Sequence, residues 1–281
     1  MFRILVKKKI NPQVVYMELE APHVVENARA GQFVVIRIDE KGERIPLTIV
    51  DKSKEKGAIS LIFQEAGKTT KKLSAMNSGD GVKDVIGPLG RATDIEKVGN
   101  VICIGGGVGT AEIYSVTRAF KKAGNEVISI IGARNKELLL LADEMKAISS
   151  QLYIATDDGS AGRKGFVTDI LKELLEENKN KYALVYAVGP ILMMKAAAVI
   201  TKEHNLKTVI SLNSNMVDAT GMCGTCRVTV GGQTKFTCVD GPDFDAHQVD
   251  FGELINRDRR FKDKEEEALR RYEETTRGKK S

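Results

Sequence analysis

Val101 to Gly109, VICIGGGVG, is the stretch that decides the fold of this chain. The short apolar run predicts a buried strand, and the glycines after it predict a tight turn into a helix. Such glycines let the backbone approach a pyrophosphate at the start of the helix, where unpaired N–H groups favour anions. The four glycines are Gly105, Gly106, Gly107 and Gly109. Because their order differs from the standard Gly-x-Gly-x-x-Gly, the turn alone predicts a phosphate-facing loop rather than a particular nucleotide.

The glycine turn lies in a region, residues 97 to 212, where Val- and Ile-rich runs alternate with helical patterns. The predicted strands are 98–104, 126–132, 151–156, 182–188 and 207–212. The predicted helices are 109–123, 141–148, 165–175 and 191–203. Near-continuous apolar strands joined by helices predict an α/β doubly wound nucleotide-binding domain, with helices on both faces of a parallel sheet.

Residues 1 to 96 have a different pattern, in which short alternating runs are separated by turn residues. The predicted strands are 3–9, 14–20, 32–38, 45–51, 58–64 and 82–86, and one helix is expected over 69–76. Six short strands at this spacing predict a small antiparallel β-barrel. The remaining residues, 213 to 281, form a third part with a cysteine-rich loop and a polar tail.

Composition narrows the class of protein. A chain of 281 residues has room for two domains and a small appendage. Its net charge of +5 is small against 43 basic and 38 acidic side chains, and no dense basic stripe points to nucleic acid. No apolar run approaches the ~18–20 residues of a membrane span. The N-terminal charges follow the apolar run, the wrong order for a signal peptide, so we expect a cytoplasmic protein.

The third part holds three of the four cysteines in one spacing. Cys223, Cys226 and Cys238 follow Asp218, which stands five residues before the first of them. A plant-type [2Fe–2S] site has the spacing Cys-x4-Cys-x2-Cys and a more distant cysteine. Clustered cysteines also indicate a reducing compartment and metal chemistry. The spacing therefore predicts a [2Fe–2S] cluster, with aspartate in the first ligand position.

Other interpretations fit the same residues. Three thiolates and a carboxylate can hold structural zinc, although the second Cys or His pair of most zinc modules is missing. In that case the chain is a zinc-stabilised nucleotide-binding scaffold and not an enzyme. A disulfide is a further possibility. Asp218 can also cap the loop by accepting hydrogen bonds from backbone amides, with another group completing the metal site.

Two short motifs in the barrel suggest a second phosphate-bearing ligand. The first motif consists of Arg44, Pro46, Leu47 and Thr48, and the second of Gly67, Thr69 and Thr70. The arginine can hold a flavin phosphate, and the hydroxyl at the end of the strand can touch the flavin ring. The second motif begins the predicted helix and can cradle a phosphate.

In this order the motifs resemble those of the ferredoxin–NADP reductase superfamily, over about residues 1–255. Asp157 and Asp158, with the glycine after them, resemble its nicotinamide-nucleotide loop. Gly189, Pro190 and Met193 resemble its Cys-Gly-Pro-x-x-Met motif near the nicotinamide. The resemblance implies an oxidoreductase with FAD between the barrel and the nucleotide domain, NAD(H) on the nucleotide domain, and the cluster beyond the flavin.

The resemblance also implies roles for the barrel residues. Arg44 would neutralise the FAD pyrophosphate, and Thr48, the catalytic residue, would hydrogen-bond near flavin N5. Gly67, with Thr69 or Thr70, would bind FAD phosphate. Hydride would pass between NAD(H) and the flavin, and single electrons would pass to the cluster, while the protein positions and tunes the cofactors.

The C-terminal cluster loop narrows the resemblance to the branch with the electron-transfer subunit of dihydroorotate dehydrogenase B. That subunit has cysteines where this chain has Asp218 and Val188. Residues 211–226 are more similar to the small subunits of NADH-dependent ferredoxin:NADP oxidoreductases, also known as sulfide dehydrogenases. This implies electron bifurcation in a heterodimer, with a large subunit that holds a second flavin and [4Fe–4S] clusters and binds NADP(H) and ferredoxin. A dihydroorotate dehydrogenase subunit is the alternative.

The two aspartates predict a preference for NAD(H) over NADP(H). Asp157 and Asp158 end the third strand of the nucleotide domain. A carboxylate there can accept a hydrogen bond from the ribose 2′-hydroxyl and repels a 2′-phosphate. A solvated acidic turn is the other interpretation.

The tail after Asp250 is polar and has charge pairs four residues apart, which predicts a solvated helix. We expect the cluster loop and this tail to lie at or near the contact with the partner subunit.

Overall fold

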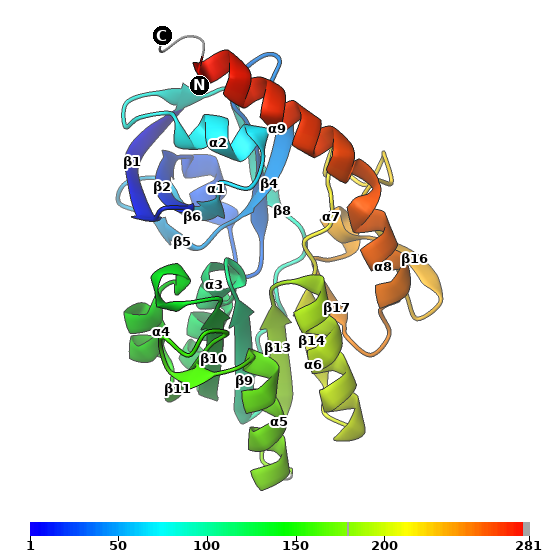
Figure 1. Ribbon diagram of the computed structural model, residues 1–281. Coiled ribbons are helices and arrows are strands. Elements are labelled where there is room, and N and C mark those ends of the chain that lie inside the picture. Colours follow the sequence, from blue (N-terminus) through cyan, green and yellow to red (C-terminus); the bar gives the residue numbers. More distant parts are fainter. Residues whose placement is uncertain (179, 278–281) are drawn as a thin grey trace.

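The computed structural model describes residues 1–178 and 180–277. Figure 1 shows the barrel above the doubly wound domain, with the third part beside both and a long C-terminal helix crossing back over the barrel. Among the described residues, no helix has both the length and the apolar character to cross a membrane.

The barrel prediction is confirmed: two antiparallel sheets enclose one apolar core. The sheet orders are β5-β6-β2-β1-β7 and β4-β3-β8. The strands are β1 (Phe2–Asn11), β2 (Val14–Glu20), β3 (Phe33–Arg37), β4 (Arg44–Thr48), β5 (Asp51–Ser53), β6 (Ala58–Gln64), β7 (Gly81–Val82) and β8 (Asp84–Leu89). Val15, Met17 and Leu19 alternate along β2 and all point into the core. Helices α1 (Pro22–Asn27) and α2 (Lys68–Ser74) lie against it.

Two strands that the sequence predicts as continuous are each divided in the structure. The predicted strand 45–51 is β4 in one sheet and β5 in the other, joined through the buried residues Ile49 and Val50. The predicted strand 82–86 is divided between β7, which pairs with β1, and β8, which pairs with β3. The chain changes sheet at both places, and these crossings close the barrel.

The doubly wound prediction is also confirmed. The sheet order is β12-β11-β10-β9-β13-β14-β17, and β17 alone runs antiparallel to its neighbour. The strands are β9 (Asn100–Gly106), β10 (Glu126–Ala133), β11 (Gln151–Thr156), β12 (Arg163–Lys164), β13 (Leu184–Val188), β14 (Thr208–Ser211) and β17 (Asp243–Asp245). The helices are α3 (Gly109–Lys122), the 3-10 turn η1 (Lys136–Leu138), α4 (Ala142–Ile148), α5 (Val167–Glu177) and α6 (Ile191–Glu203).

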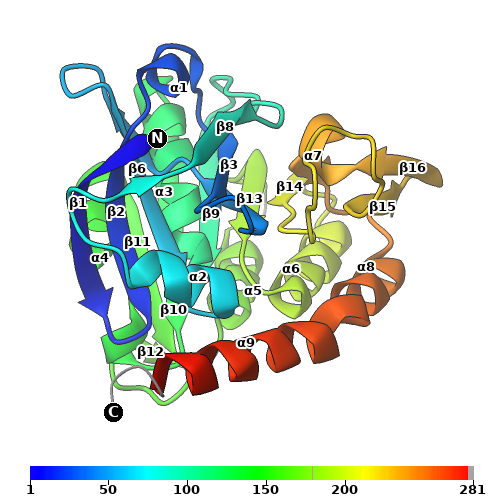
Figure 2. The same ribbon diagram turned by 90° about the horizontal axis from the view of Figure 1, so that it is seen from above.

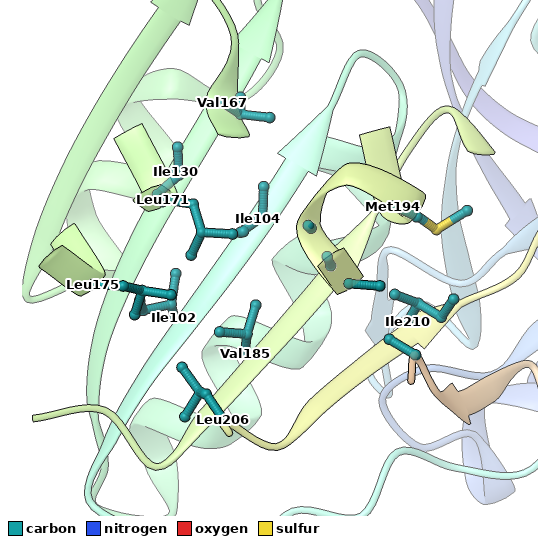
Figure 3. Close-up of a cluster of buried hydrophobic side chains, with 14 of the residues drawn as sticks. Ile102, Ile104, Ile130, Val167, Leu171, Leu175, Val185, Met194, Leu206 and Ile210 are labelled. Carbon is teal, nitrogen blue, oxygen red and sulfur yellow. The ribbon is translucent and has the colours of Figure 1, made fainter. Parts of the chain in front are cut away.

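Alternate residues of each strand serve the two faces of this sheet. Ile102 and Ile104 of β9 pack with Leu171 and Leu175 of α5, as Figure 3 shows. Their neighbours in β9, Val101 and Cys103, face α3 and α4 on the other side. Because successive strand side chains point to opposite faces, a strand covered by helices on both sides is apolar throughout.

Strand β9 is where the chain reverses its direction of winding. From β9 the chain adds β10, β11 and β12 on one side, and then returns to add β13 and β14 on the other. The loops after β9 and β13 therefore leave the carboxyl edge of the sheet in different directions. Open α/β sheets bind their ligands at such a switch point.

The third part begins with the cluster loop and continues into a hairpin and helices. These elements are β15 (Arg227–Val230), β16 (Gln233–Phe236), α7 (Thr237–Asp240), α8 (Phe251–Asp258), η2 (Arg259–Phe261) and α9 (Lys262–Arg277). Helix α9 has no buried residue and reaches α2 of the barrel, where Lys71 forms an ion pair with Glu273. Figure 2 shows it running along one side of the molecule. The solvated tail helix is thus present; residues 278–281 of the predicted tail lie outside the described part.

Candidate functional site

The glycine turn after β9 packs directly against the loop after β13. A Cβ atom on Gly109 would lie 2.4 Å from the carbonyl oxygen of Val188. One on Gly106 would lie 2.6 Å from Met193 Sδ and 3.1 Å from Pro190 Cδ. A larger residue at Gly109 would collide with the backbone, whereas one at Gly106 would require the Met193 side chain to move. The structure thereby brings together the predicted residues Gly105, Gly106, Gly107, Gly109, Gly189, Pro190 and Met193.

The outer side of the same turn is open. Gly107 has a φ of +57°, and a Cβ atom there would meet no atom within 4 Å. Helix α3 begins at Gly109, and no side chain caps its N-terminus. The N–H groups of Thr110 and Ala111 bond back to the carbonyl oxygens of Gly107 and Val108, and the positive end of the dipole of this 14-residue helix favours an anion there. This edge of the sheet fits a dinucleotide pyrophosphate.

Asp157 and Asp158 both follow β11 and are exposed. Asp158 Oδ1 accepts hydrogen bonds from the backbone N–H (2.9 Å) and the hydroxyl (2.6 Å) of Ser160. This aspartate shapes its own turn, and those hydrogen bonds lower the pKa of its carboxyl. The Asp157 carboxylate has no hydrogen bond within the described ranges, so of the two it is the better placed to meet a ribose hydroxyl.

The first barrel motif lies on β4, an edge strand of the three-stranded sheet. Arg44 is exposed, and the other three residues of the motif, Pro46, Leu47 and Thr48, are half-buried. Thr48 pairs directly with Phe33 of β3. A half-buried strand with one unpaired edge provides a surface on which a flat ring system can lie.

The second barrel motif is held by Glu43, which the sequence analysis missed. Glu43 accepts hydrogen bonds from Thr69 Oγ1 (2.6 Å) and Lys68 Nζ (2.7 Å). Thr70 Oγ1 accepts a hydrogen bond from the N–H of Gly67 at 3.0 Å. A Cβ atom on Gly67 would meet no atom within 4 Å, so a ligand can approach the backbone there. The two barrel motifs fit FAD in their chemistry.

Glu112 is a second residue that the sequence analysis did not select. It is half-buried in the first turn of α3, directly after the glycine turn. Burial raises the pKa of its carboxyl to about 7. The nearby Thr48 hydroxyl lowers this pKa, and the Asp243 carboxylate raises it further. The sequence signal for this residue is an acid three residues after the last glycine of the turn. Glu112 lies between the predicted nucleotide residues and the predicted flavin residue Thr48.

A buried network joins the three parts of the molecule beneath this site. Asp243 of β17 accepts hydrogen bonds from Thr93 Oγ1 at 2.6 Å and from the Tyr186 hydroxyl at 2.9 Å. Thr93 lies between the barrel and β9, and Tyr186 lies on β13. Burial raises the pKa of Asp243 to about 6, although these hydroxyls and that of Ser211 lower it. The network fixes the third part against the nucleotide sheet.

The predicted metal ligands form two pairs. The sulfur atoms of Cys226 and Cys238 are 3.3 Å apart and buried. This distance exceeds the ~2.05 Å of a disulfide bond, and all four cysteines are free. Cys223 is exposed, and its backbone N–H donates to Asp218 Oδ2 at 2.9 Å. Within the described ranges, no three His, Cys, Asp or Glu side chains converge on one metal position.

Asp218 has the capping arrangement that the sequence left open. Its second oxygen, Oδ1, accepts a hydrogen bond from the N–H of Thr220 at 2.9 Å, and these bonds lower the pKa of its carboxyl. The sulfur of Cys223 lies 3.3 Å from Thr225 Oγ1. Burial alone would raise the pKa of the Cys223 thiol, but hydrogen bonding with the hydroxyl and the amide of Thr225 lowers it.

The loop suits an anionic cluster because its amides face sulfur. Gly221 and Gly224 have φ values of +83° and +65°, which turn the backbone around the cysteines. The amide of Gly221 faces the sulfur of Cys238, although burial raises the pKa of that thiol to about 12. Three thiols, a carboxylate and inward-facing amides fit a [2Fe–2S] cluster, whose potential depends on hydrogen bonds to sulfur.

The cluster loop contacts the flavin barrel directly. Cys226, Cys238 and Ala219 share one buried apolar cluster with Phe33 and Val35 of β3. Since Phe33 is the direct partner of Thr48, a single strand pair separates the predicted flavin residue from two cluster cysteines.

Three family models match the chain in succession. The oxidoreductase FAD-binding domain matches residues 1–93, and the oxidoreductase NAD-binding domain matches residues 103–199. The iron–sulfur cluster binding domain of dihydroorotate dehydrogenase B matches residues 213–250. The predictions of FAD, NAD and an iron–sulfur cluster are confirmed at the level of domains, so the chain is an oxidoreductase component and not a zinc scaffold.

Whole proteins match as well. The chain is 47% identical to the dihydroorotate dehydrogenase B (NAD(+)) electron transfer subunit homologue of Thermotoga maritima, over 97% of this chain and 95% of that protein. It is 32% identical to the corresponding electron transfer subunit of Desulforamulus reducens, over 88% of this chain and 96% of that protein.

A solved structure agrees with these relatives and with the predicted resemblance. The structure of an NADH-dependent reduced ferredoxin–NADP oxidoreductase, described for flavin-based electron bifurcation, is 46% identical. It covers 97% of this chain and 98% of the matched chain, with a TM-score of 0.91. The chain therefore belongs to the family of dihydroorotate dehydrogenase B electron-transfer subunits and their homologues, within the ferredoxin–NADP reductase-like oxidoreductases.

Proposed function

We propose that this chain is the small electron-transfer subunit of an electron-bifurcating NADH-dependent ferredoxin:NADP oxidoreductase. The observation that carries the proposal is the junction of three sites. Thr48 lies beside Glu112, the acid that follows the nucleotide turn. Thr48 also pairs with Phe33, and Phe33 packs on Cys226 and Cys238 of the cluster loop. A nucleotide, a flavin and a cluster held by these residues would form one short sequence of electron carriers.

The residues have distinct tasks in this proposal. The glycine turn and Gly189 hold the pyrophosphate and nicotinamide of NAD(H), and Arg44 neutralises the FAD pyrophosphate. Thr48 hydrogen-bonds near flavin N5, and the carboxyl of Glu112 beside it can hold a proton near neutral pH. FAD, when bound, supplies the conversion between hydride and single electrons. Asp218, Cys223, Cys226 and Cys238 hold the [2Fe–2S] cluster.

A large partner subunit completes the proposed enzyme. It would hold a second flavin and [4Fe–4S] clusters and bind NADP(H) and ferredoxin. The 46% identity to the bifurcating oxidoreductase, over nearly the whole of both chains, supports this partner. Asp218 and Val188, which replace the cysteines of the dihydroorotate dehydrogenase pattern, support it as well.

The proposal can be tested by anaerobic purification from the native source, with counts of flavin and iron and an assay of the intact complex. We expect a large flavin and iron–sulfur subunit to co-purify. Oxidation of NADPH should then require NAD⁺ and oxidised ferredoxin together. NADPH oxidation that proceeds with either acceptor alone would contradict bifurcation.

The second candidate is an electron-transfer subunit for dihydroorotate oxidation, which the names of both curated relatives favour. In that case the co-purifying subunit would oxidise dihydroorotate and the complex would reduce NAD⁺ without NADPH. The same preparation therefore separates the two candidates.

The contribution of the tail can be examined separately. A deletion should begin at Lys262, because Arg257 and Arg260 contact the cluster loop. Loss of α9 removes the Lys71–Glu273 ion pair and no buried residue, so NADH-dependent dye reduction should persist while affinity for the large subunit falls. Unchanged affinity would identify α9 as a solvated extension.

A further inference from the structure

Arg257 of α8 reaches the backbone of the cluster loop between two of the proposed ligands. Its Nη2 donates to the carbonyl oxygen of Thr225 at 3.0 Å and to that of Gly224 at 3.3 Å. Both carbonyls belong to the short segment between Cys223 and Cys226. Arg257 thus contacts main-chain carbonyls and forms no ion pair within residues 1–178 and 180–277, although the Glu253 carboxylate lies near enough to raise its pKa.

The position of Arg257 is fixed by the elements around it. Asp250 caps α8 by accepting from the N–H of Glu253 at 2.9 Å, and Glu253 Oε2 accepts from the N–H of Thr229 of β15 at 3.0 Å. Leu254, three residues before Arg257, is buried on the same face of the helix. Helix α8 is therefore held against the hairpin that follows the cluster loop.

The carbonyl contacts determine where the neighbouring amides point. In a trans peptide the C=O and N–H groups point in opposite directions. The carbonyls of Gly224 and Thr225 face Arg257, and that of Gly224 also accepts from the N–H of Arg227 at 3.3 Å, so the N–H groups of Thr225 and Cys226 point to the other side. The hydroxyl of Thr225, 3.3 Å from the sulfur of Cys223, lies on that side too.

Arg257 is one of three arginines that crowd behind the loop. Arg260 Nη2 also reaches the Thr225 carbonyl, at 3.4 Å, and Arg227 begins β15. Burial, and then the charges of Arg260 and Arg227, lower the pKa of Arg257. Its Nε is buried and has no hydrogen-bond partner within the described ranges. The Glu253 carboxylate partly offsets these three positive charges, and an anionic cluster in the loop would offset them further.

We infer that Arg257 is a positioning residue that raises the reduction potential of the cluster held by this loop. It directs two loop amides toward the sulfurs and places one partly buried positive charge behind them. A cluster with four anionic ligands becomes more negative when it accepts an electron, so amides and a positive charge favour its reduced state. The inference rests on the proposed function only in requiring the cluster.

A purely structural role for Arg257 would fasten α8 to the loop without affecting the cluster electronically. The two roles differ in a measurable quantity. Fastening affects stability and cluster retention, whereas positioning also changes the midpoint potential of clusters that remain. Lysine at this position keeps the charge but lacks the planar fork that reaches two carbonyls, so it separates charge from orientation.

The experiment compares Arg257→Gln, Arg257→Lys and Arg259→Gln in the full chain with its partner subunit. Arg259 is the matched control, because it is an exposed arginine two residues away with no contact to the loop in the described structure. Iron content and an EPR-monitored redox titration of the [2Fe–2S] signal are measured for each. An Arg257→Gln protein that fails to assemble is replaced in the comparison by Arg257→Lys.

We expect Arg257→Gln to lower the potential. At the wild-type midpoint, the ratio of reduced to oxidised cluster should fall about three- to tenfold, the effect of removing one partly buried charge near a redox centre. Arg257→Lys should give a smaller fall, and Arg259→Gln should leave the ratio unchanged. Equal potentials in wild type and both Arg257 variants, with full iron content, would overturn the inference while leaving the proposed function intact. Absence of a [2Fe–2S] signal in the wild type would overturn both.

Discussion

The nucleotide turn and the cluster loop are both glycine-rich segments that serve a bound group, and they are built in opposite ways. In the nucleotide turn, Cβ atoms on Gly105, Gly106 or Gly109 would lie within 3 Å of other atoms. In the cluster loop, Met222 is 87% exposed. A Cβ atom on Gly224 would meet only Phe236, at 3.6 Å, and one on Gly221 would meet only the side chain of Val239, at 3.0 Å, so these glycines are required by their positive φ values more than by packed backbone.

The difference shows what fixes each shape. The nucleotide turn is set by two parallel strands and a helix, so contacts within the chain itself hold its backbone. The cluster loop is held by a few side-chain hydrogen bonds, from Asp218, Thr225 and Arg257, and its four ligands form two separate pairs. Metal binding in such a loop contributes to the folding of the site itself. Steric changes should therefore harm the first region, and changes of ligand should harm the second.

The largest effect is expected from Gly109→Ala. The added methyl would lie 2.4 Å from the Val188 carbonyl oxygen, and neither backbone can move without disturbing β9 or β13. We expect a loss of at least about 2–4 kcal/mol in the free energy of unfolding, and loss of NADH-dependent dye reduction. Denaturant unfolding and a diaphorase assay would measure the two effects.

The matched stability control is Gly67→Ala. Gly67 has a φ of −134°, and a methyl there would meet no atom within 4 Å. Its free energy of unfolding should stay within about 0.5 kcal/mol of wild type. If Gly109→Ala were equally harmless, the nucleotide turn would be as adaptable as the cluster loop, and the comparison would fail.

The second effect concerns Asp218, where the structure shows capping and the spacing predicts a ligand. As a ligand, Asp218→Ala should lose or destabilise the cluster, and Asp218→Cys should keep it with changed absorption, EPR g-values and midpoint potential. Asp218→Asn retains an oxygen that can accept from the loop amides but has no charge, so it should lose most of the iron.

Iron content and EPR spectra of the three Asp218 variants separate ligand from cap. If Asp218→Cys has the spectrum and potential of wild type, the aspartate is not a ligand. If Asp218→Asn keeps a full complement of iron, capping alone accounts for the role of this residue.

The sequence predicted elements whose signal is local and periodic. Strand β2 and helix α6 have the predicted bounds, 14–20 and 191–203. The sequence missed α1, β12, the hairpin β15–β16, and β17, because these elements are short and depend on tertiary pairing. Residues 243–245 have no strand pattern of their own and join the sheet as an antiparallel edge next to β14.

The same limit applies to the site. Glycines and cysteines show their function by spacing within a few residues, so the nucleotide turn and the cluster loop could be found. Other residues owe their function to neighbours that are far away in the chain, as Glu112, Asp243 and Arg257 do. Asp243, for example, accepts a hydrogen bond from Thr93, which is 150 residues earlier. No periodicity or motif records such a contact.

The third effect concerns Asp243, the rigid support beneath the nucleotide turn. Its folded pKa of about 6 exceeds the ordinary 3.8, so the native state binds more protons than the unfolded state between these values. Its stabilising contribution is full below about pH 4 and is lost as the pH rises through about 6. Asp243→Asn should remove this loss and be more stable than wild type by up to about 3 kcal/mol at pH 7.5.

The amide in Asp243→Asn can still accept from the Tyr186 hydroxyl, and the Thr93 hydroxyl can rotate to accept from it. Urea unfolding at pH 4.5 and 7.5 measures the change. The charge of Asp94 raises the pKa of Asp243, and the charge of Asp243 raises that of Glu112. A smaller dependence of the free energy of unfolding on pH should therefore remain in the variant. A variant with the full wild-type dependence would show that Asp243 does not titrate in this range.

The smallest effect should come from Asp157, at the exposed margin of the nucleotide site. Asp158 is tied to Ser160, so a preference for NAD(H) depends on the carboxylate of Asp157. Asp157→Ala removes its repulsion of a 2′-phosphate and its hydrogen bond to a 2′-hydroxyl. The ratio of kcat/KM for NADPH to that for NADH should rise about tenfold, because one such contact contributes roughly 1.4 kcal/mol.

The control variant is Asp158→Ala, since it loosens the turn without removing the charge of Asp157. Two results would contradict this prediction: a wild-type chain that uses NADPH as well as NADH, or a kcat/KM ratio that changes only in Asp158→Ala. Either result would show that Asp157 belongs to a solvated turn and that the nucleotide site ends at the glycine turn.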